Sequence, residues 1–284
     1  MKRSIFSSFS FLSFSIVSAL TLVGPDQTAL AGGSTGKSIV TFVATDHRFA
    51  GPDRITAGVT TMQVINRGHD LHHIQLLKLA PGKTADDFRA AIAADPSRFP
   101  AWVTFVGGPN AVVPGQEAAA TMMLAEGDYL LICLIPSEQG VPHVALGMQK
   151  PLVVKGGKAT VISRPKADLS ITTSDFHFRQ SQPISAGTHT VEVVNRGSQT
   201  HEVVLVKLNP GVTARDFGAA VEPRTSTPPP GMPIGGIVGI EPGDQAFFTA
   251  RFEPGHYGLI CFFPDAVTGK PHFMHGMTAD FVVQ

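Results

Sequence analysis

The chain has 284 residues, enough for two domains of ordinary size, and its 43% hydrophobic content can supply two cores. Lys+Arg and Asp+Glu each total 22, so the formal net charge is zero. This balance excludes a basic footprint for nucleic acid and a polybasic face for an anionic membrane. Two Cys, 11 His and 8 Met are the more informative part of the composition.

Residues 1–31 have the pattern of a signal peptide. Lys2 and Arg3 are followed by an apolar stretch to Val23, and Ala29 and Ala31 offer small residues at the cleavage positions. We expect the mature protein to be periplasmic or secreted. A retained membrane anchor is the alternative, although no later segment is long and apolar enough to span a bilayer.

The sequence after residue 31 contains an internal repeat of two similar copies. Asn66-Arg67-Gly68 recurs as Asn195-Arg196-Gly197, and Tyr129-Leu130-Leu131-Ile132-Cys133 recurs as Tyr257-Gly258-Leu259-Ile260-Cys261. The spacing of such pairs is constant apart from one residue that is lost and then regained in the second copy. The repeat predicts a duplicated domain, with one copy at 38–156 and the other at 165–284.

Each copy is predicted to be mostly β. The alternating stretches at residues 61–66 and 190–195 predict strands that end in the Asn-Arg-Gly turns. Thr84 and Asp87 open a helical pattern that runs to Ala94, and residues 213–220 form its shorter counterpart. The fold class is therefore all-β: two Greek-key sandwiches or barrels, each with one short inserted helix.

Each copy also contains the same four metal-binding side chains in the same order. Two imidazoles and a thiolate in a plane, with a weak thioether on the axis, form a blue-copper donor set that holds both Cu(I) and Cu(II). The candidate metal ligands are His72, Cys133, His143 and Met148 in the first copy, and His201, Cys261, His272 and Met277 in the second.

This pattern resembles the cupredoxin family, which includes plastocyanin and azurin. Gly127-Asp128-Tyr129 and Gly255-His256-Tyr257 lead into the strands that end at the cysteines, as the family's penultimate strand does. The resemblance implies tandem cupredoxin-like domains, one type 1 copper site in each, and electron transfer with a redox partner protein.

The sequence departs from the family in two places. The loop from cysteine to histidine is longer, so residues 137–140 must bulge outward to return His143 to the metal. The family's usual Asn after the first histidine ligand is replaced by His73 and by Glu202, which alters the support of the ligand loops.

Other roles are open for several of these side chains. Cys133 and Cys261 could form a disulfide or be buried structural thiols. His275 is expected at the rim of the site, as a substitute should His272 point away. The phenols of Tyr129 and Tyr257 are expected to hydrogen-bond the backbone. The remaining histidines are expected at the surface or in support of the ligands: His47, His69, His73, His177 and His256.

The sequence predicts an electron carrier and not an enzyme. Two-domain copper enzymes resemble one another in a His beside the type 1 cysteine or in His-X-His pairs, and neither recurs in both copies here. Periplasmic copper scavenging and a metal-free interaction module are the alternative functions.

Overall fold

The computed structural model describes residues 39–96, 98–156, 164–221 and 228–284. The predicted signal peptide, residues 1–31, lies outside these ranges, as do residues 157–163 between the two predicted copies. Within the ranges that are described, no helix has the length and hydropathy needed to cross a membrane.

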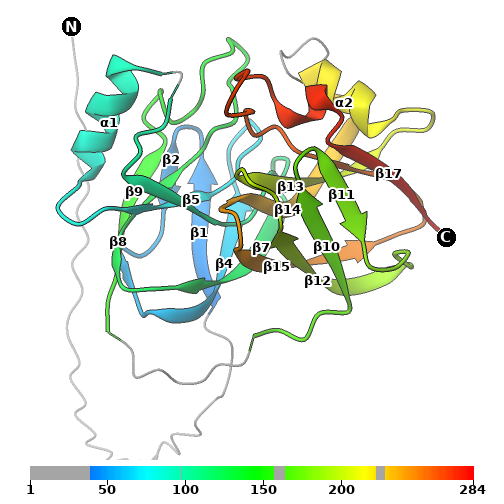
Figure 1. Cartoon of the computed structure of the whole chain (residues 1–284), viewed down its shortest axis with the longest axis horizontal. Coiled ribbons are helices and arrows are strands. Elements are labelled where there is room, and N and C mark those ends of the chain that lie inside the picture. The colour runs from blue at the N-terminus through cyan, green and yellow to red at the C-terminus, as the bar shows by residue number, and fades with distance from the viewer. Residues whose placement is uncertain (1–38, 97, 157–163, 222–227) are drawn as a thin grey trace, which may run out of the picture. The chain divides into compact units, whose positions relative to one another are not determined.

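The first repeat forms nine strands and one helix among the described residues (Figure 1). In chain order these are β1 (Ile39–Thr45), β2 (Arg48–Ala50), β3 (Arg54–Ile55), β4 (Gly58–Asn66), β5 (Gln75–Leu79), α1 (Ala85–Ala94), β6 (Val103–Gly107), β7 (Glu117–Leu124), β8 (Gly127–Ile132) and β9 (Gln149–Val154).

The second repeat follows the same plan. Its elements are β10 (Leu169–Ser174), β11 (His177–Gln180), β12 (Gly187–Asn195), β13 (His201–Leu208), α2 (Ala214–Val221), β14 (Gly231–Ile240), β15 (Gln245–Phe252), β16 (Gly255–Ile260), the 3-10 helix η1 (His272–His275) and β17 (Thr278–Val283). Both predicted helices are present within a residue of their expected bounds, and the two predicted strands are present but begin three residues earlier, at Gly58 and Gly187.

Two sheets run through both repeats. One has the order β11-β10-β12-β15-β7-β4-β1-β2, and the other has the order β17-β16-β13-β14-β6-β5-β8-β9-β3. Within each repeat the first long strand pairs in parallel with the strand before the Asn-Arg-Gly turn: β1 with β4, and β10 with β12. The two sheets enclose one apolar core that includes side chains from both repeats. The predicted all-β, two-repeat sandwich is thus confirmed.

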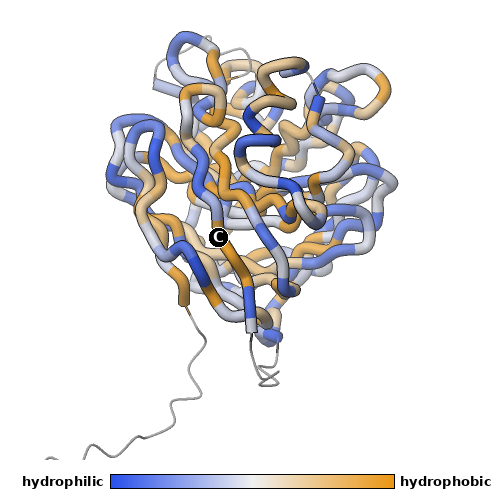
Figure 2. The backbone as a smooth tube through the Cα atoms, turned by 90° about the vertical axis from the view of Figure 1, so that its left-hand side faces the viewer, coloured by the Kyte–Doolittle hydropathy of each residue, from blue (hydrophilic) through white to orange (hydrophobic). Residues whose placement is uncertain are grey.

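Each helix covers the outer face of the sheet that carries the cysteines. Thr84 caps α1: its hydroxyl accepts from the amide of Asp87 at 3.1 Å, and the Asp87 carboxylate accepts from the amide of Thr84 at 2.8 Å. Phe88 of α1 then packs on Leu77 and Leu130. Strands β5 and β8 are therefore buried on both faces, which explains their continuous apolar sequence. Figure 2 shows such apolar stretches in orange, with hydrophilic stretches in blue.

The repeats join through backbone pairing. β15 pairs with β7, and β14 pairs with β6 and with residues 108–112. The amide of Asn110 donates to the carbonyl of Gly236 at 3.2 Å, and the amide of Val238 donates to that of Gly108 at 3.1 Å. Gly108 and Gly236 occupy equivalent positions and have φ of +137° and +111°. A Cβ on Gly236 would overlap the carbonyl oxygen of Val203, and a Cβ on Gly108 would overlap that of Ile74, so glycine is needed where each segment passes close to a neighbouring strand or loop of its own repeat.

We expect Gly236→Ala to destabilise the protein by more than about 3 kcal/mol, because it adds a backbone clash to the cost of a positive φ. Gly243→Ala is the matched control: φ there is +87°, but a Cβ would meet nothing within 4 Å. The control should cost only about 1 kcal/mol. Urea unfolding measures both, and equal losses would contradict the close approach of Gly236 to Val203.

Candidate metal centre

The Asn-Arg-Gly turn holds the loop that carries the first histidine of each site. The buried Asn66 side chain donates to the carbonyl of Asp70 at 2.7 Å and of Val112 at 2.9 Å, and its Oδ1 accepts from the amide of Gly68 at 2.9 Å. Asn195 makes the same three contacts in the second repeat. One buried amide therefore fixes the path of the chain into His72 and into its counterpart, His201.

A carboxylate holds the far side of each of these two rings. Nε2 of His72 lies 3.4 Å from Asp46 Oδ1, and Nε2 of His201 lies 2.9 Å from Asp175 Oδ1. The carboxylate accepts from the Nε2–H group, which leaves Nδ1 as a lone-pair donor. Glycine is required beside this contact, since a Cβ on Gly68 would overlap both Asp46 and His72.

Each cysteine comes directly after a buried strand, and the second histidine returns to it on the following loop. The carbonyl of Cys133 accepts from the amide of Val144 at 2.8 Å, and the amide of His143 donates to the carbonyl of Ile135 at 2.9 Å. Pro136 and Pro142 form a bridge, beyond which residues 138–140 are exposed. The longer loop bulges outward, as expected, without moving His143 away from the cysteine.

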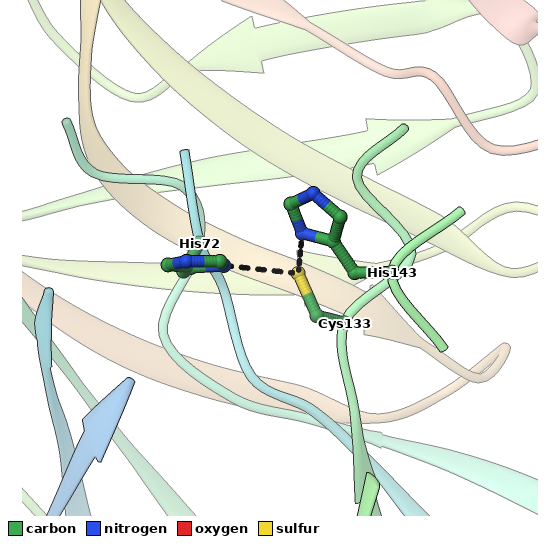
Figure 3. A group of neighbouring side chains, drawn as sticks. All are labelled: His72, Cys133 and His143. Carbon is green, nitrogen blue, oxygen red and sulfur yellow. Dashed lines mark hydrogen bonds between the residues drawn. The ribbon is translucent and has the colours of Figure 1, made fainter. Parts of the chain in front are cut away.

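Two imidazoles and the thiol converge in each repeat, and Figure 3 shows this for His72, Cys133 and His143 of the first repeat. Cys133 Sγ lies 4.0 Å from His72 Nδ1 and 3.5 Å from His143 Nδ1. In the second repeat Cys261 Sγ lies 3.4 Å from His272 Nδ1, which lies 3.0 Å from His201 Nδ1.

These separations suit a metal ion. A cation bound in a trigonal plane at about 2.0 Å from nitrogen and about 2.3 Å from sulfur keeps its donors roughly 3.5–3.8 Å apart. All six side chains are buried. Two imidazoles with one thiolate form the donor set of copper among the first-row metals, and copper is the cofactor that fits both groups.

The two methionines reach the same region through the backbone. The amide of Cys133 donates to the carbonyl of Met148 at 3.3 Å, and the amide of Cys261 donates to that of Met277 at 3.3 Å. Both methionine side chains are buried. Their role as fourth ligands stays a prediction.

Burial keeps the donors neutral. It lowers the pKa of His143 and of His272 to about 4, and raises the pKa of the Cys133 thiol to about 12. At neutral pH the imidazole lone pairs are free for a metal, whereas the thiol must lose its proton as the metal binds.

The backbone is strained at one position beside each second histidine. His47 and Phe176 have φ of 60° and 65°, and they are the residues other than glycine with positive φ in the described part of the chain. They are equivalent in the repeat. His47 packs edge-on against His143 at 5.4 Å, and Phe176 against His272 at 5.2 Å. A bulky ring at positive φ is costly, so its recurrence beside both imidazoles indicates that the two repeats share the same backbone constraint at this turn.

His73 and Glu202, which follow the first histidine of each site, connect the two sites through hydrogen bonds. Nε2 of His73 accepts from the amide of Leu134 at 2.8 Å, and Glu202 Oε1 accepts from the amide of Phe262 at 2.9 Å. Asn110 lies between them: it donates to Glu202 Oε2 at 3.1 Å and hydrogen-bonds His73. His73 and Glu202 therefore each accept a hydrogen bond from the backbone amide of the residue that follows a cysteine. Together the three form a hydrogen-bonded bridge between the repeats, called here the His73–Asn110–Glu202 bridge.

Solved structures of copper proteins match this chain at low similarity. Auracyanin from Roseiflexus castenholzii, a reduced form, matches with 22% identity over 40% of this chain and 94% of its own, with a TM-score of 0.30. A multicopper oxidase matches at 12% identity over 87% of this chain and 88% of its own, with a TM-score of 0.25. Copper nitrite reductase from Nitrosomonas europaea matches at 16% identity over 88% and 94%, with a TM-score of 0.25. No protein-family model and no curated protein sequence matches the chain.

These matches correct one prediction. A multicopper oxidase and copper nitrite reductases, which are enzymes, are among the solved structures that match this chain. The expectation that the chain is not an enzyme, drawn from the missing His-X-His pairs, is therefore wrong.

Several of the alternatives from the sequence are now resolved. Cys133 and Cys261 are both free and buried, which excludes the disulfide. The Tyr129 and Tyr257 hydroxyls donate to the carbonyls of residues 125 and 253, as expected. His275 lies exposed at the rim, 3.0 Å from the Thr268 hydroxyl, and does not substitute for a ligand.

The sequence did not reveal the roles of Asp46, Asp175 and Asn110. The two aspartates recur in the repeat, and that recurrence is the signal that could have found them. Asn110 has no such signal, because its counterpart in the second repeat is Val238 and its partners come from distant parts of the chain.

Burial raises the pKa of Glu202 to about 7. Between its ordinary value and pH 7 the unfolded chain ionises while the folded protein stays protonated, so the protein loses stability as the pH rises through this window. We expect Glu202→Gln to remove up to about 3 kcal/mol of this loss, measured by denaturant unfolding of the chelator-treated protein at pH 5 and pH 8. Glu138→Gln, at an exposed loop position, is the control. A pH dependence unchanged in Glu202→Gln would contradict the burial of this carboxyl group.

Proposed function

We propose that each repeat holds one copper ion and that the chain carries electrons for a redox partner. The ligands would be His72, Cys133, His143 and Met148 in the first site, and His201, Cys261, His272 and Met277 in the second. The observation that carries this proposal is the convergence of two neutral imidazoles and one thiol, all buried, at equivalent places in both repeats.

The protein holds the donor atoms in fixed positions and shields them from water. Bound copper supplies a one-electron Cu(I)/Cu(II) couple. The buried Asn66 and Asn195 fix the first histidine loop, and the backbone hydrogen bonds around each cysteine fix the second. A donor set that is in place before the metal binds rearranges little when its charge changes, and this favours rapid electron transfer.

Apolar side chains near the second histidines offer a surface for the partner. Val141 and Leu146 flank His143, and Val267 and Met274 flank His272; all four are exposed. An apolar rim above a buried ligand suits a transient partner that must come close to the metal and then leave.

We further propose that the chain is exported, with residues 1–31 as the signal peptide and the two domains at 38–156 and 165–284. The charged start, the apolar stretch and the small residues at positions 29 and 31 support export. The limits of the domains rest on the repeat.

Loading with Cu(II) is the direct test. We expect two copper ions per chain and intense visible absorption from thiolate-to-copper charge transfer. Cys133→Ser and Cys261→Ser should each remove one copper and about half of this absorption, and the double variant should lose all of it. Ser137→Ala, which keeps every proposed ligand, is the control. A colourless chain that binds no copper would sink the proposal and favour the metal-free module.

Copper binding should release close to one proton per site at neutral pH. The Cys133 thiol has a pKa of about 12 and is protonated in the metal-free protein, whereas His143, with a pKa of about 4, has no proton to lose. The apparent affinity should therefore rise about tenfold for each pH unit between pH 6 and pH 8. Calorimetry in buffers of different ionisation enthalpy counts the protons, and a count near zero would show that the thiol is not a ligand.

Electron transfer and scavenging differ in what happens to the metal. A carrier keeps both copper ions through repeated reduction and reoxidation, and it exchanges electrons with a soluble redox protein in a stopped-flow experiment. Loss of copper to a competing chelator after each reduction would favour scavenging.

A further inference from the structure

The His73–Asn110–Glu202 bridge connects a proposed ligand of one metal centre to a proposed ligand of the other. His73 directly follows His72, and Glu202 directly follows His201. Asn110 lies between them, where it donates to Glu202 Oε2 at 3.1 Å and hydrogen-bonds the imidazole of His73. Two hydrogen bonds therefore join histidines that belong to different repeats.

The same bridge is also attached to both cysteine loops. Nε2 of His73 accepts from the amide of Leu134 at 2.8 Å, and Oε1 of Glu202 accepts from the amide of Phe262 at 2.9 Å. Each of these amides belongs to the residue directly after a cysteine. A continuous path of covalent and hydrogen bonds thus runs from a histidine and the cysteine of one centre to those of the other.

An apolar cavity of about 390 Å³ lies beside this path, between the two repeats. Leu134 lines it from the first repeat and Phe262 lines it from the second, while His73, Asn110 and Glu202 form part of its wall. An electron tunnels more readily along covalent and hydrogen bonds than across empty space. The bridge is therefore a better route between the cysteine loops than the cavity is.

The fold does not require an amide at the centre of the bridge. Asn110 is 1% exposed, and burial of a polar side chain costs free energy that its hydrogen bonds must offset. Its counterpart in the second repeat is Val238, and the backbone amides of both residues donate across the junction in the same way. An apolar residue thus fills the equivalent position, and what Asn110 adds is the connection between the centres.

We propose that the His73–Asn110–Glu202 bridge carries electrons between the two metal centres, so that a redox partner that docks at one centre serves both. This inference rests on the proposed function, because it needs copper in both centres. The step is a one-electron exchange, in which one copper goes from Cu(I) to Cu(II) while the other goes from Cu(II) to Cu(I). No bond forms or breaks, and no proton moves.

The test delivers electrons beside the first centre. Gln139 is exposed in the loop before His143, and Gln139→Cys offers a thiol for a maleimide-linked ruthenium photosensitiser. The label is attached after copper loading, when Cys133 and Cys261 are buried and ligated. Under illumination with triethanolamine as electron donor, we expect all of the visible absorption to bleach, the second half at a rate independent of protein concentration. Bleaching that stops at half would overturn the proposal.

Removal of the first centre measures the background. In the labelled chain, Cys133→Ser leaves only direct reduction of the second centre by the label or by the donor. We expect this reduction to be at least about tenfold slower than the second half of the bleaching in the parent chain. Equal rates would show that the electrons bypass the first centre.

Asn110→Val tests the route itself. It places the residue found at Val238 in the first repeat and removes the link between His73 and Glu202. The second half of the bleaching should slow at least about tenfold, because a gap replaces two hydrogen bonds, while the rate of the first half stays the same. An unchanged second half would exclude the bridge as the route.

Gln75→Val is the matched control. Gln75 is also buried, it also donates across the junction, to the carbonyl of Gly239 at 3.1 Å, and its counterpart is also a valine, Val204. Both halves of the bleaching should keep their rates in this variant. Equal slowing in Gln75→Val and Asn110→Val would assign the effect to the junction as a whole and contradict the bridge.

Glu202→Gln breaks the bridge at a second point. Its side-chain oxygen can still accept from the amide of Phe262, but its NH₂ group then faces the donating amide of Asn110. The second half of the bleaching should slow here too, with the copper content unchanged. A normal rate in Glu202→Gln would refute the route even if Asn110→Val fails to fold.

Copper content and absorption, measured on the same samples, separate this inference from the proposed function. A chain that takes up no copper would contradict the proposed function, and the electron route with it. A chain that holds two copper ions and shows the full absorption, but bleaches only by half, would keep the copper sites and lose the route between them.

Discussion

The pairing of the second repeat with the first is the constraint on which the rest of the molecule depends. Strand β14 lies against residues 108–112 and β15 lies against β7, so each sheet continues from one repeat into the other. Gly108 and Gly236 take part in this pairing, and each also lies very close to the backbone of its own repeat, at Ile74 and at Val203. As a result the same face of each repeat is turned inward, and the core, the cavity and the His73–Asn110–Glu202 bridge all lie along the junction.

Duplication explains why the two metal centres are so alike, and the junction explains where they differ. The buried asparagine, the glycine, the carboxylate and the strained residue recur at equivalent positions around both first and second histidines. These parts lie within one repeat. The bridge lies between repeats and is unequal: a neutral histidine supports one cysteine loop, and a carboxyl group supports the other. Copies of one ancestral site can thus acquire different properties at the surface where they meet.

The bridge also gives a physical role to the residues that follow the first histidine of each site. The side chains of His73 and Glu202 reach the amide after each cysteine and still meet Asn110 from the other side. The support of the loops is therefore extended across the junction.

The sequence by itself determined the repeat, the strand pattern, the capped helix at Thr84 and the identity of the converging donors. Strand periodicity, capping and the order of donor types are local or repeated signals, and duplication displayed each of them twice. Tertiary structure alone decided that the sheets merge, that Asn110 joins His73 to Glu202, and that Gln75 Oε1 is buried without a hydrogen-bond partner among the described residues. The partners in these contacts lie far apart along the chain and on opposite repeats, so no local pattern encodes them. Asn110 and Gln75 lack a matching residue in the other copy, and the repeat therefore gave no signal for either.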